Sequence, residues 1–275
     1  MLDYQSFIGL KKTNIETEMD FLNENLKRKG FHIIENFITP EQVTSLRNKI
    51  LSSWEIQKDK YGEDHLIKIG DFGVCRGLIE YDSEFLKLLT SNNINMVLKA
   101  TIGETAILHL QNGIVLFPDL KHNQARYHRD FPKTFISSEL LSINIFILLD
   151  EFTAANGGTY LVPNSHHISE MPSEKYIEQN QIQIEAPAGS AVIFDSMLWH
   201  KGGMNSTQKP RLAMNNQFTK AFIKQQLNYP EMMKGKIDIE SKEAQRIGMW
   251  AVPPRSVDEY RVKDPALRTY RAGQG

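Results

Sequence analysis

Apolar and polar residues follow two different periods along the chain, and these periods divide it into three parts. Within residues 15–100 the apolar positions of three stretches recur at helical spacing, with one short strand-like run between the first two and a polar segment before the third. Over 105–219, runs rich in Val, Ile and Phe are separated by Gly, Pro and Asn, which indicates strands and turns. Beyond 219 the helical spacing returns. We therefore expect helical support and the first strands, then a β-rich core, then a helical extension and tail over 220–275.

The first part carries explicit start and stop signals. A helix is predicted to end at Gly30, where glycine tolerates the left-handed backbone of a helix terminus. The β-branched and aromatic run Phe31–Glu35 predicts an edge strand. Thr39, followed by Pro40 and by Gln42, is typical of a capped helix start, since the Thr and Gln side chains can satisfy the first free backbone N–H groups.

Other segments are assigned from composition. Residues 55–80, polar and with spaced glycines, are predicted to form a loop, and 83–100 to be helical. The polar stretch 168–180 is predicted to be a helix or a lid over an opening. Residues 220–229 and 243–250 are predicted to be helical.

The strand-rich part predicts the fold class. The longest apolar run, residues 140–149, is rich in β-branched side chains and ends before an Asn-Gly-Gly turn, which favours a buried strand. Residues 106–117 form either a hairpin that turns at Asn112-Gly113 or one long strand. With the runs at 159–162, 181–186 and 191–194, they indicate a mainly β protein with flanking helices. We expect a jelly-roll or cupin-like barrel, a double-stranded β-helix, within a single domain over 1–275.

Composition excludes several classes of partner. The formal net charge of the 275 residues is −1, so no nucleic-acid or membrane-surface partner is expected. No apolar run approaches the roughly 20 residues of a membrane span, and the first residues do not resemble a signal peptide. The single cysteine, Cys75, rules out an internal disulfide. These features predict a cytoplasmic protein, and the sequence carries no pattern that indicates its oligomeric state.

Candidate chemistry centres on His128 and Asp130. Two residues apart on a strand, they share one face and can form two corners of a metal site. His200, which follows the apolar run 191–194, is the best third ligand. Two histidines and one carboxylate on one face leave three coordination positions open, as in non-haem iron(II) oxygenases. Arg211 adds a guanidinium that can bind a carboxylate bidentately. Alone, a His-x-Asp pair is often coincidental, and His128 could be an oriented core residue.

Several motifs, in order, resemble the phytanoyl-CoA dioxygenase family, a branch of the iron(II)- and 2-oxoglutarate-dependent oxygenases that includes ectoine hydroxylase. The resemblance covers roughly residues 30–50 and 105–220. It is carried by an opening strand and helix (30–43), a Tyr-His-Arg-Asp step (127–130), an Asp-Glu…Asn-Gly-Gly…Val-Pro-Asn-Ser-His block (150–166), and the positions of His200 and Arg211. The sequence departs at Asn164, where glycine is usual; that loop residue is not a ligand.

The resemblance implies an iron(II) bound by His128, Asp130 and His200, with 2-oxoglutarate as cosubstrate, O₂ as oxidant and Arg211 as the anchor of the cosubstrate's second carboxylate. It also favours one long strand through 106–117, with Gln111 facing the pocket. Gln111 and Asn144 are further candidates for contacts to 2-oxoglutarate. Halogenase relatives replace the metal-binding carboxylate with a small residue, so Asp130 favours hydroxylation or another C–H oxidation.

Four other histidines are assigned structural or surface roles. His65 lies in the expected loop, and His166 and His167 follow a structural turn. His109 would share a face with Gln111 on a regular strand, but we expect it to pack. Two other functions remain open: a cupin-type metal enzyme that does not use 2-oxoglutarate, or a non-catalytic binding domain of the same fold.

Overall fold

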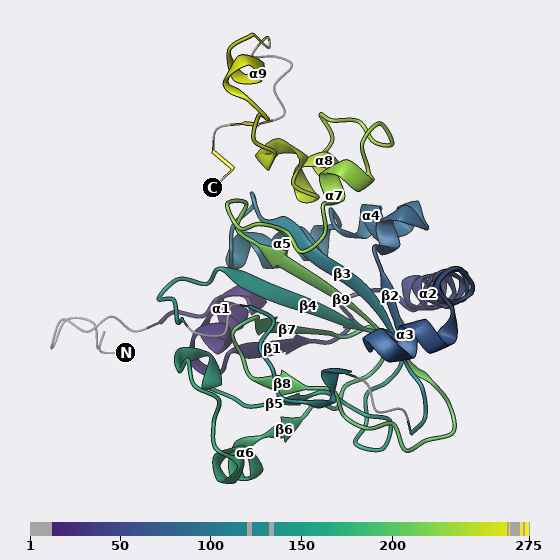
Figure 1. The fold of residues 1–275 in the computed structure, drawn as a ribbon. Helices are drawn as coiled ribbons and strands as arrows, with labels where there is room; N and C mark the ends of the chain where they lie inside the picture. Colours follow the sequence, from purple (N-terminus) through teal and green to yellow (C-terminus); the bar gives the residue numbers. More distant parts are fainter. Residues whose placement is uncertain are drawn as a thin grey trace, which may run out of the picture.

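The computed structural model describes residues 13–119, 123–131 and 135–262, together with 264, 270–271 and 273–274. The fold is mainly antiparallel β-sheet with helices at both ends of the chain (Figure 1). The strands are β1 (Phe31–Ile34), β2 (Val74–Arg76), β3 (Ile107–Leu116), β4 (Ser142–Leu148), β5 (Tyr160–Leu161), β6 (Ile182–Gln183), β7 (Ala191–Asp195), β8 (His200–Lys201) and β9 (Arg211–Thr219). The α-helices are α1 (Glu18–Lys29), α2 (Pro40–Tyr61), α3 (Glu63–Ile69), α4 (Ser83–Leu88), α5 (Asn92–Ala100), α6 (Glu174–Asn180), α7 (Tyr229–Met232), α8 (Lys242–Arg246) and α9 (Val257–Val262).

The strands form two sheets that face each other. The larger sheet has the order β1-β7-β4-β9-β3-β2, and the smaller has the order β6-β5-β8. Neighbouring strands are antiparallel throughout, and many neighbours are far apart in the sequence. This arrangement confirms the predicted double-stranded β-helix. β1 lies at the edge of the larger sheet, as its short β-branched run predicted.

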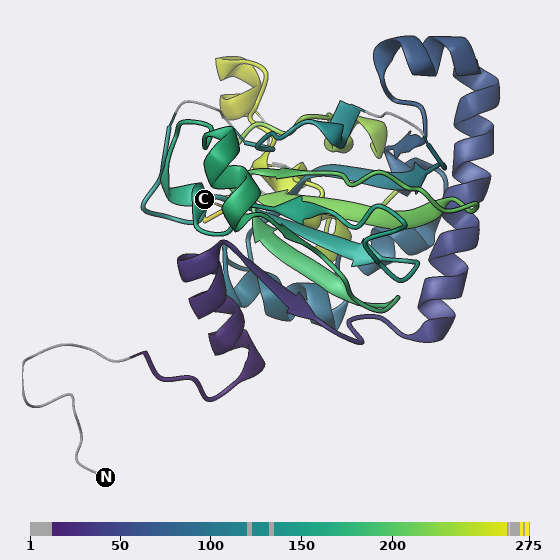
Figure 2. The same cartoon turned by 90° about the horizontal axis from the view of Figure 1, so that it is seen from below.

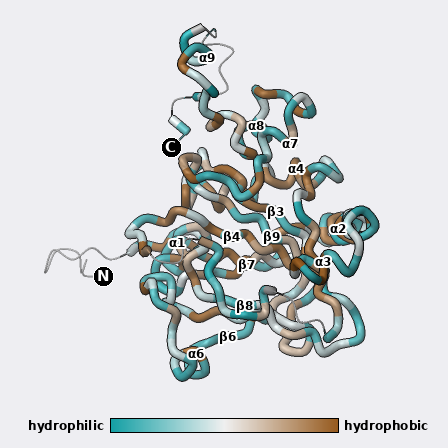
Figure 3. The backbone as a smooth tube through the Cα atoms, viewed as in Figure 1, coloured by the Kyte–Doolittle hydropathy of each residue, from teal (hydrophilic) through white to brown (hydrophobic). Residues whose placement is uncertain are grey.

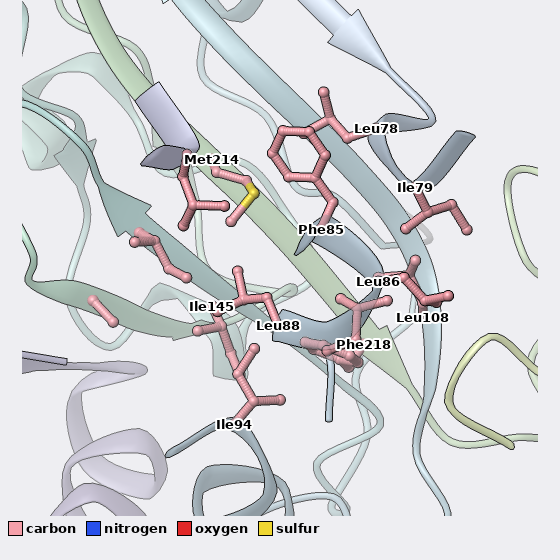
Figure 4. Packing of buried hydrophobic residues seen from close by; sticks show 14 of the residues in the cluster. Leu78, Ile79, Phe85, Leu86, Leu88, Ile94, Leu108, Ile145, Met214 and Phe218 are labelled. Carbon is pink, nitrogen blue, oxygen red and sulfur yellow. The ribbon is translucent and has the colours of Figure 1, made fainter. Parts of the chain in front are cut away.

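One face of the larger sheet is covered by helices, and the main apolar core lies between them. Alternate residues of the strands, such as Ile145 on β4 and Met214 and Phe218 on β9, pack against side chains of α4 and α5 (Figure 4). Helix α2 runs crosswise to the strands (Figure 2). It contributes Trp54 to the core, and this residue is 1% exposed. Since one face of each strand is committed to this core, the other face is left to form the cavity.

The opposite face of the larger sheet carries a smaller apolar cluster shared with the second sheet. Phe146, Leu148, Phe194 and Ala213 belong to it. Figure 3 shows the consequence for hydropathy: the central strands are largely apolar, whereas the outer loops and α6 are largely polar. No helix in the described part of the chain is long and apolar enough to cross a membrane.

The predicted helix boundaries near the N-terminus are confirmed. The Thr39 hydroxyl accepts a hydrogen bond from the backbone N–H of Gln42, whose side chain accepts one from the backbone N–H of Thr39. Gly30 ends α1 with a φ of 85°, in the left-handed region. A side chain there would meet His166 and Leu198 at 2.6 and 2.7 Å, so packing as well as backbone conformation excludes a Cβ.

Two regions differ from the prediction. Residues 55–80 are not a loop: α2 continues to Tyr61, and α3 and β2 follow. The buried face of α2 includes the polar Gln57, whose side chain hydrogen-bonds both the backbone N–H and the C=O of Arg76 in β2, which hid the helical pattern. Residues 220–229 are mostly turns rather than a helix. Residues 1–12 and most of the tail beyond 262 fall outside the described residues.

Candidate active site

The three predicted ligands lie together on the inner side of the barrel. His128 and His200 form a single antiparallel bridge, with backbone hydrogen bonds of 2.9 and 3.1 Å, and their ring centres are 4.3 Å apart. The Asp130 carboxylate oxygens lie 3.4 Å from Nε2 of His128 and 3.6 Å from Nε2 of His200. The segment is not the continuous strand expected from its spacing. The single bridge is still enough to hold the segment so that the side chains of His128 and Asp130 both lie beside His200.

This donor set fits a divalent first-row metal. One potential ligand atom from each residue lies within 4.8 Å of the others, a separation that one ion can span. The Nδ1 atoms of His128 and His200 each lie 2.9 Å from a backbone carbonyl oxygen, of Arg126 and Leu198 respectively. A carbonyl can only accept, so each Nδ1 donates and each Nε2 keeps its lone pair for a metal.

Asp130 is held in its charged form. Burial favours the neutral acid, but His200, His128 and a hydrogen bond from Asn144 outweigh it, and the pKa of Asp130 lies below its ordinary value. Its backbone N–H also donates to the carbonyl of Ser196 at 3.0 Å. Burial lowers the pKa of His200, which favours the neutral imidazole that a metal requires.

Asn144 is part of a buried polar network beneath Asp130. Its Nδ2 donates to Oγ of Ser196 at 3.0 Å, and its Oδ1 accepts from Nδ2 of Asn215 at 2.9 Å. Ser142 and Gln217 extend the network through the same Ser196 hydroxyl. Such a network restricts the orientation of Asn144, and through it that of the Asp130 carboxylate.

Arg211 is a buried cation with unused donors. Its side chain lies over the Phe152 ring, 3.9 Å from the ring centre, and Nη2 donates to the carbonyl of Gly157 at 2.9 Å. The buried Nε and Nη1 have no partner among the described residues. Burial lowers the pKa of Arg211 to about 9, although the nearby Asp150 opposes this. An unsatisfied buried guanidinium of this kind is suited to an incoming carboxylate.

One cavity of about 300 Å³ joins these groups. The triad lies on its wall, and Arg211 lies on the same wall at the start of β9. Phe146 and Phe194 supply apolar surface between them. A metal and an organic anion could therefore occupy the same cavity in contact with each other.

Gln111 is not brought to this cavity. It is fully buried on the helix-covered face of β3, where its Nε2 hydrogen-bonds Asn216 and the carbonyl of Phe85. The strand is continuous, as the resemblance favoured, but a β-bulge between Leu108 and Leu110 shifts the alternation by one residue. Asn112 consequently lines the cavity, a position that a regular alternation would not select.

Two polar residues that line the cavity, Asn215 and Arg76, were not among the predicted site residues. Asn215 is four residues after Arg211 on the same strand, so the period of two places both on one face. Arg76 also lines the cavity, but its position on β2 was hidden by the mistaken loop assignment.

Four histidines that were expected to have structural or surface roles are not part of the candidate metal cluster: His65, His109, His166 and His167. His109 sits at the bulge, with its ring 6.3 Å from that of Phe131, and is not part of the metal-binding cluster in the described residues. The ring centres of His166 and His167 are 3.7 Å apart with the rings tilted by 41°, and His167 hydrogen-bonds the carbonyl of Lys27 at the end of α1. His65 is exposed on α3.

A double-stranded β-helix with two histidines and one carboxylate converging in its cavity is the architecture of cupin-like, metal-dependent oxygenases. The chain belongs to the phytanoyl-CoA dioxygenase family, whose sequence profile matches residues 26–213. The family and its dioxygenase relatives identify the protein as an oxygenase.

Relatives extend over most of the chain. An uncharacterized protein of Mycobacterium tuberculosis is 33% identical over 273 residues, covering 96% of this chain and 98% of that protein. The ectoine dioxygenase of Nocardia farcinica is 23% identical over 217 residues, covering 67% of this chain and 72% of that enzyme. The crystal structure of EctD from S. alaskensis, described with 2-oxoglutarate and 5-hydroxyectoine, shares the fold: its TM-score is 0.60 at 17% identity, covering 72% of this chain and 74% of that one.

Proposed function

We propose that this protein is an iron(II)- and 2-oxoglutarate-dependent dioxygenase that hydroxylates, or otherwise oxidises, an unactivated C–H bond of a small molecule. The observation that carries the proposal is the presence of two complementary sites in one cavity. The His128–Asp130–His200 cluster fits a divalent metal, and Arg211 offers two buried nitrogens, Nε and Nη1, that have no hydrogen-bond partner among the described residues. The relatives named as dioxygenases, and the similarity to an EctD structure that contains 2-oxoglutarate, support the same assignment.

Each residue of the site would have a separate role. His128 and His200 would bind iron through Nε2, and Asp130 would complete one face and reduce the charge of the site. Iron, when bound, would supply the open coordination positions at which 2-oxoglutarate is decarboxylated to succinate and O₂ is activated. Arg211 would hold the distal carboxylate of 2-oxoglutarate and fix its orientation. Phe146 and Phe194 would keep water away from the reacting groups.

For Asn144 the structure supports a different role from contact with 2-oxoglutarate. Its amide is committed to Ser196, Asn215 and Asp130. We assign it to holding the Asp130 carboxylate in place. Gln111, on the far face of β3, has no direct role in this scheme.

A cupin-type metal enzyme that does not use 2-oxoglutarate would have no need for a buried, unsatisfied guanidinium beside its metal. Arg211 therefore favours the 2-oxoglutarate-dependent function over this alternative. A non-catalytic binding domain would not need both sites in one cavity. The single cysteine, Cys75, which is buried, is consistent with a protein of the reducing cytoplasm.

The test is conversion of 2-oxoglutarate to succinate by protein reconstituted with iron(II) in the presence of O₂. Slow turnover without a primary substrate is expected, and it should disappear when iron is omitted. A protein that binds iron but forms no succinate above the iron-free control would exclude the proposed cosubstrate.

A further inference from the structure

The cavity contains a second polar feature that iron and 2-oxoglutarate leave unexplained. Arg76 on β2 lies opposite Asn112 on β3, and Asn112 lies opposite Asn215 on β9. Directly opposed residues of antiparallel strands project from the same face of the sheet. All three line the cavity, so they form a row that crosses three strands. The row ends at Asn144, to which Asn215 donates, beside Asp130.

The row contains unsatisfied hydrogen-bonding capacity. Among the described residues, the buried Oδ1 atoms of Asn112 and Asn215 have no partner. The guanidinium of Arg76 donates from Nε and Nη2 to the two oxygens of Asp71, each at 2.6 Å, but its Nη1 has no hydrogen bond within the described part of the chain. Leaving the two buried Asn oxygens without a partner is unfavourable, so they are suited to a ligand that donates hydrogen bonds. The Arg76 side chain is 37% exposed, so its Nη1 can donate to a ligand that displaces water.

Arg76 is the one cavity-lining guanidinium, besides Arg211, in which a nitrogen makes no hydrogen bond among the described residues. The third, Arg129, donates to the backbone carbonyls of Met197, Ser169 and His166. Arg76 is also fixed in place: Gln57 hydrogen-bonds both its backbone N–H and its C=O. A cation held in this way can bind an anion without a large loss of conformational freedom.

Arg76 and Arg211 mark different parts of the cavity. Arg211 and Asn215 are four residues apart on β9, roughly 13 Å along the strand, and Arg76 is two strands away from β9, about a further 10 Å across the sheet. One molecule of 2-oxoglutarate bound at Arg211 and the metal would leave Arg76 free. The second cation therefore points to a second ligand, the primary substrate.

We propose that Arg76 binds a carboxylate or phosphate group of the primary substrate, and that the Oδ1 of Asn112 beside it accepts a hydrogen bond from an N–H or O–H group of the same molecule. The inference rests on the proposed function, because it places the substrate in the same cavity as the metal. Arg76 is three strands away from β4, which carries Asn144 next to Asp130, a separation of roughly 14 Å between strand axes. The acidic group is consequently several bonds away from the carbon that is oxidised.

The test uses full-length protein loaded with iron(II) and 2-oxoglutarate under anaerobic conditions. The metal-to-ligand absorption band of this complex must form first, which checks the proposed function separately. Octanoate, octyl phosphate and octanamide are then titrated, and the perturbation of the band is followed. We expect one of the two anions to bind at least about tenfold more tightly than the neutral amide, since charge-assisted hydrogen bonds are stronger. The preferred anion distinguishes a carboxylate from a phosphate.

Two variants separate recognition from a purely structural ion pair. Arg76→Ala should abolish the preference for the anion, whereas Asp71→Asn should keep or increase it, because Arg76 then loses its competing carboxylate. If the Arg76–Asp71 ion pair has only a structural role, both variants should lose the preference for the anion. Arg271→Ala is the matched control: Arg271 is ion-paired with Glu240 at 2.6 Å, its side chain is 30% exposed against 37% for Arg76, and it does not line the cavity.

A loaded complex that binds neither anion in preference to the amide, or that none of the three probes perturbs, would overturn the proposal while leaving the iron and 2-oxoglutarate assignment intact. Equal losses in Arg76→Ala and Asp71→Asn would also overturn it.

Discussion

The guanidinium carbon of Arg211 lies over the ring of Phe152, 3.9 Å from the ring centre, and Arg211 is 4% exposed. This contact, with the hydrogen bond to Gly157, holds the cation, while Nε and Nη1 have no partner among the described residues. The cation is thus oriented before any ligand arrives, which reduces the ordering cost of binding an anion.

Arg211→Ala is expected to weaken 2-oxoglutarate binding while iron content stays near that of the wild type. Truncating one partner of a buried charge pair costs roughly 2–5 kcal/mol, which corresponds to a loss of affinity of about 30- to several-thousand-fold. Arg211→Lys should fall between, because an ammonium cannot reproduce a two-pronged contact. Anaerobic titration of 2-oxoglutarate, followed by the metal-to-ligand band, measures this. Equal affinities for wild type and Arg211→Ala would remove the proposed anchor.

His128→Ala and His200→Ala should each lose tight iron binding. Either change leaves one histidine and one carboxylate, too few to hold a ferrous ion firmly in competition with water. His65→Ala serves as the control, because His65 is an exposed histidine on α3. Metal analysis after anaerobic reconstitution gives the stoichiometry. If both triad variants keep one tightly bound iron, the metal site lies elsewhere.

Asn144→Ala should reduce iron affinity through the loss of its hydrogen bond to Asp130. The matched control is Asn216→Ala, since Asn216 is equally buried on the other face of β9 and bonds Gln111 instead. Both variants should lose stability, by about 1–3 kcal/mol for each unsatisfied buried partner. Only Asn144→Ala should shift the anaerobic iron titration. Identical iron affinities in the two variants would show that Asn144 acts on stability alone.

The Asp195 carboxyl should make stability depend on pH. Burial raises its pKa to about 6, although the N–H of Met197 and the charge of Arg129 oppose this. In the unfolded chain the pKa is about 3.9, so the folded state binds the proton more tightly. The free energy of unfolding therefore falls as pH rises from about 4 to about 6, and the full cost is present above that range.

Asp195→Asn removes this cost and keeps an oxygen to accept from the N–H of Met197, a bond of 2.8 Å. At pH 8 the variant should be more stable by about 1–3 kcal/mol, and near pH 4 the gain should largely vanish. Urea denaturation of wild type and variant at the two pH values provides the comparison. A gain of the same size at both pH values would rule out titration of Asp195 as the cause.

The sequence was sufficient to predict those features that depend on interactions between neighbouring residues. The Thr39–Gln42 cap and the glycine that ends α1 depend on neighbours within a few residues, and both are confirmed. The edge strand β1 is confirmed too, although its pairing with β7 joins residues far apart in the sequence. The spacing of His128 and Asp130 likewise placed two polar groups on one side, although the segment pairs with β8 through a single bridge rather than a full strand.

The prediction failed where a polar residue took a structural role usually filled by an apolar one. Gln57 is 5% exposed on the buried face of α2, where it serves as a backbone partner for β2. Because Gln57 is polar, residues 55–80 were predicted to form a loop. That prediction missed strand β2 and the position of Arg76 on it. No nearby residue signals this role, because the partner is 19 positions away.

The sequence by itself determined the family, the barrel with its helical support, and the residue types that converge on the metal-binding cluster, since motif order and periodicity carry that information. The tertiary structure alone decided which side of β3 faces the cavity. The bulge between Leu108 and Leu110 turns Asn112 inward and Gln111 toward the helices, and no alternating pattern records such a shift. It also decided that Arg76, Asn112 and Asn215 form one row, because the register between strands distant in sequence is fixed by packing against the helix-covered core.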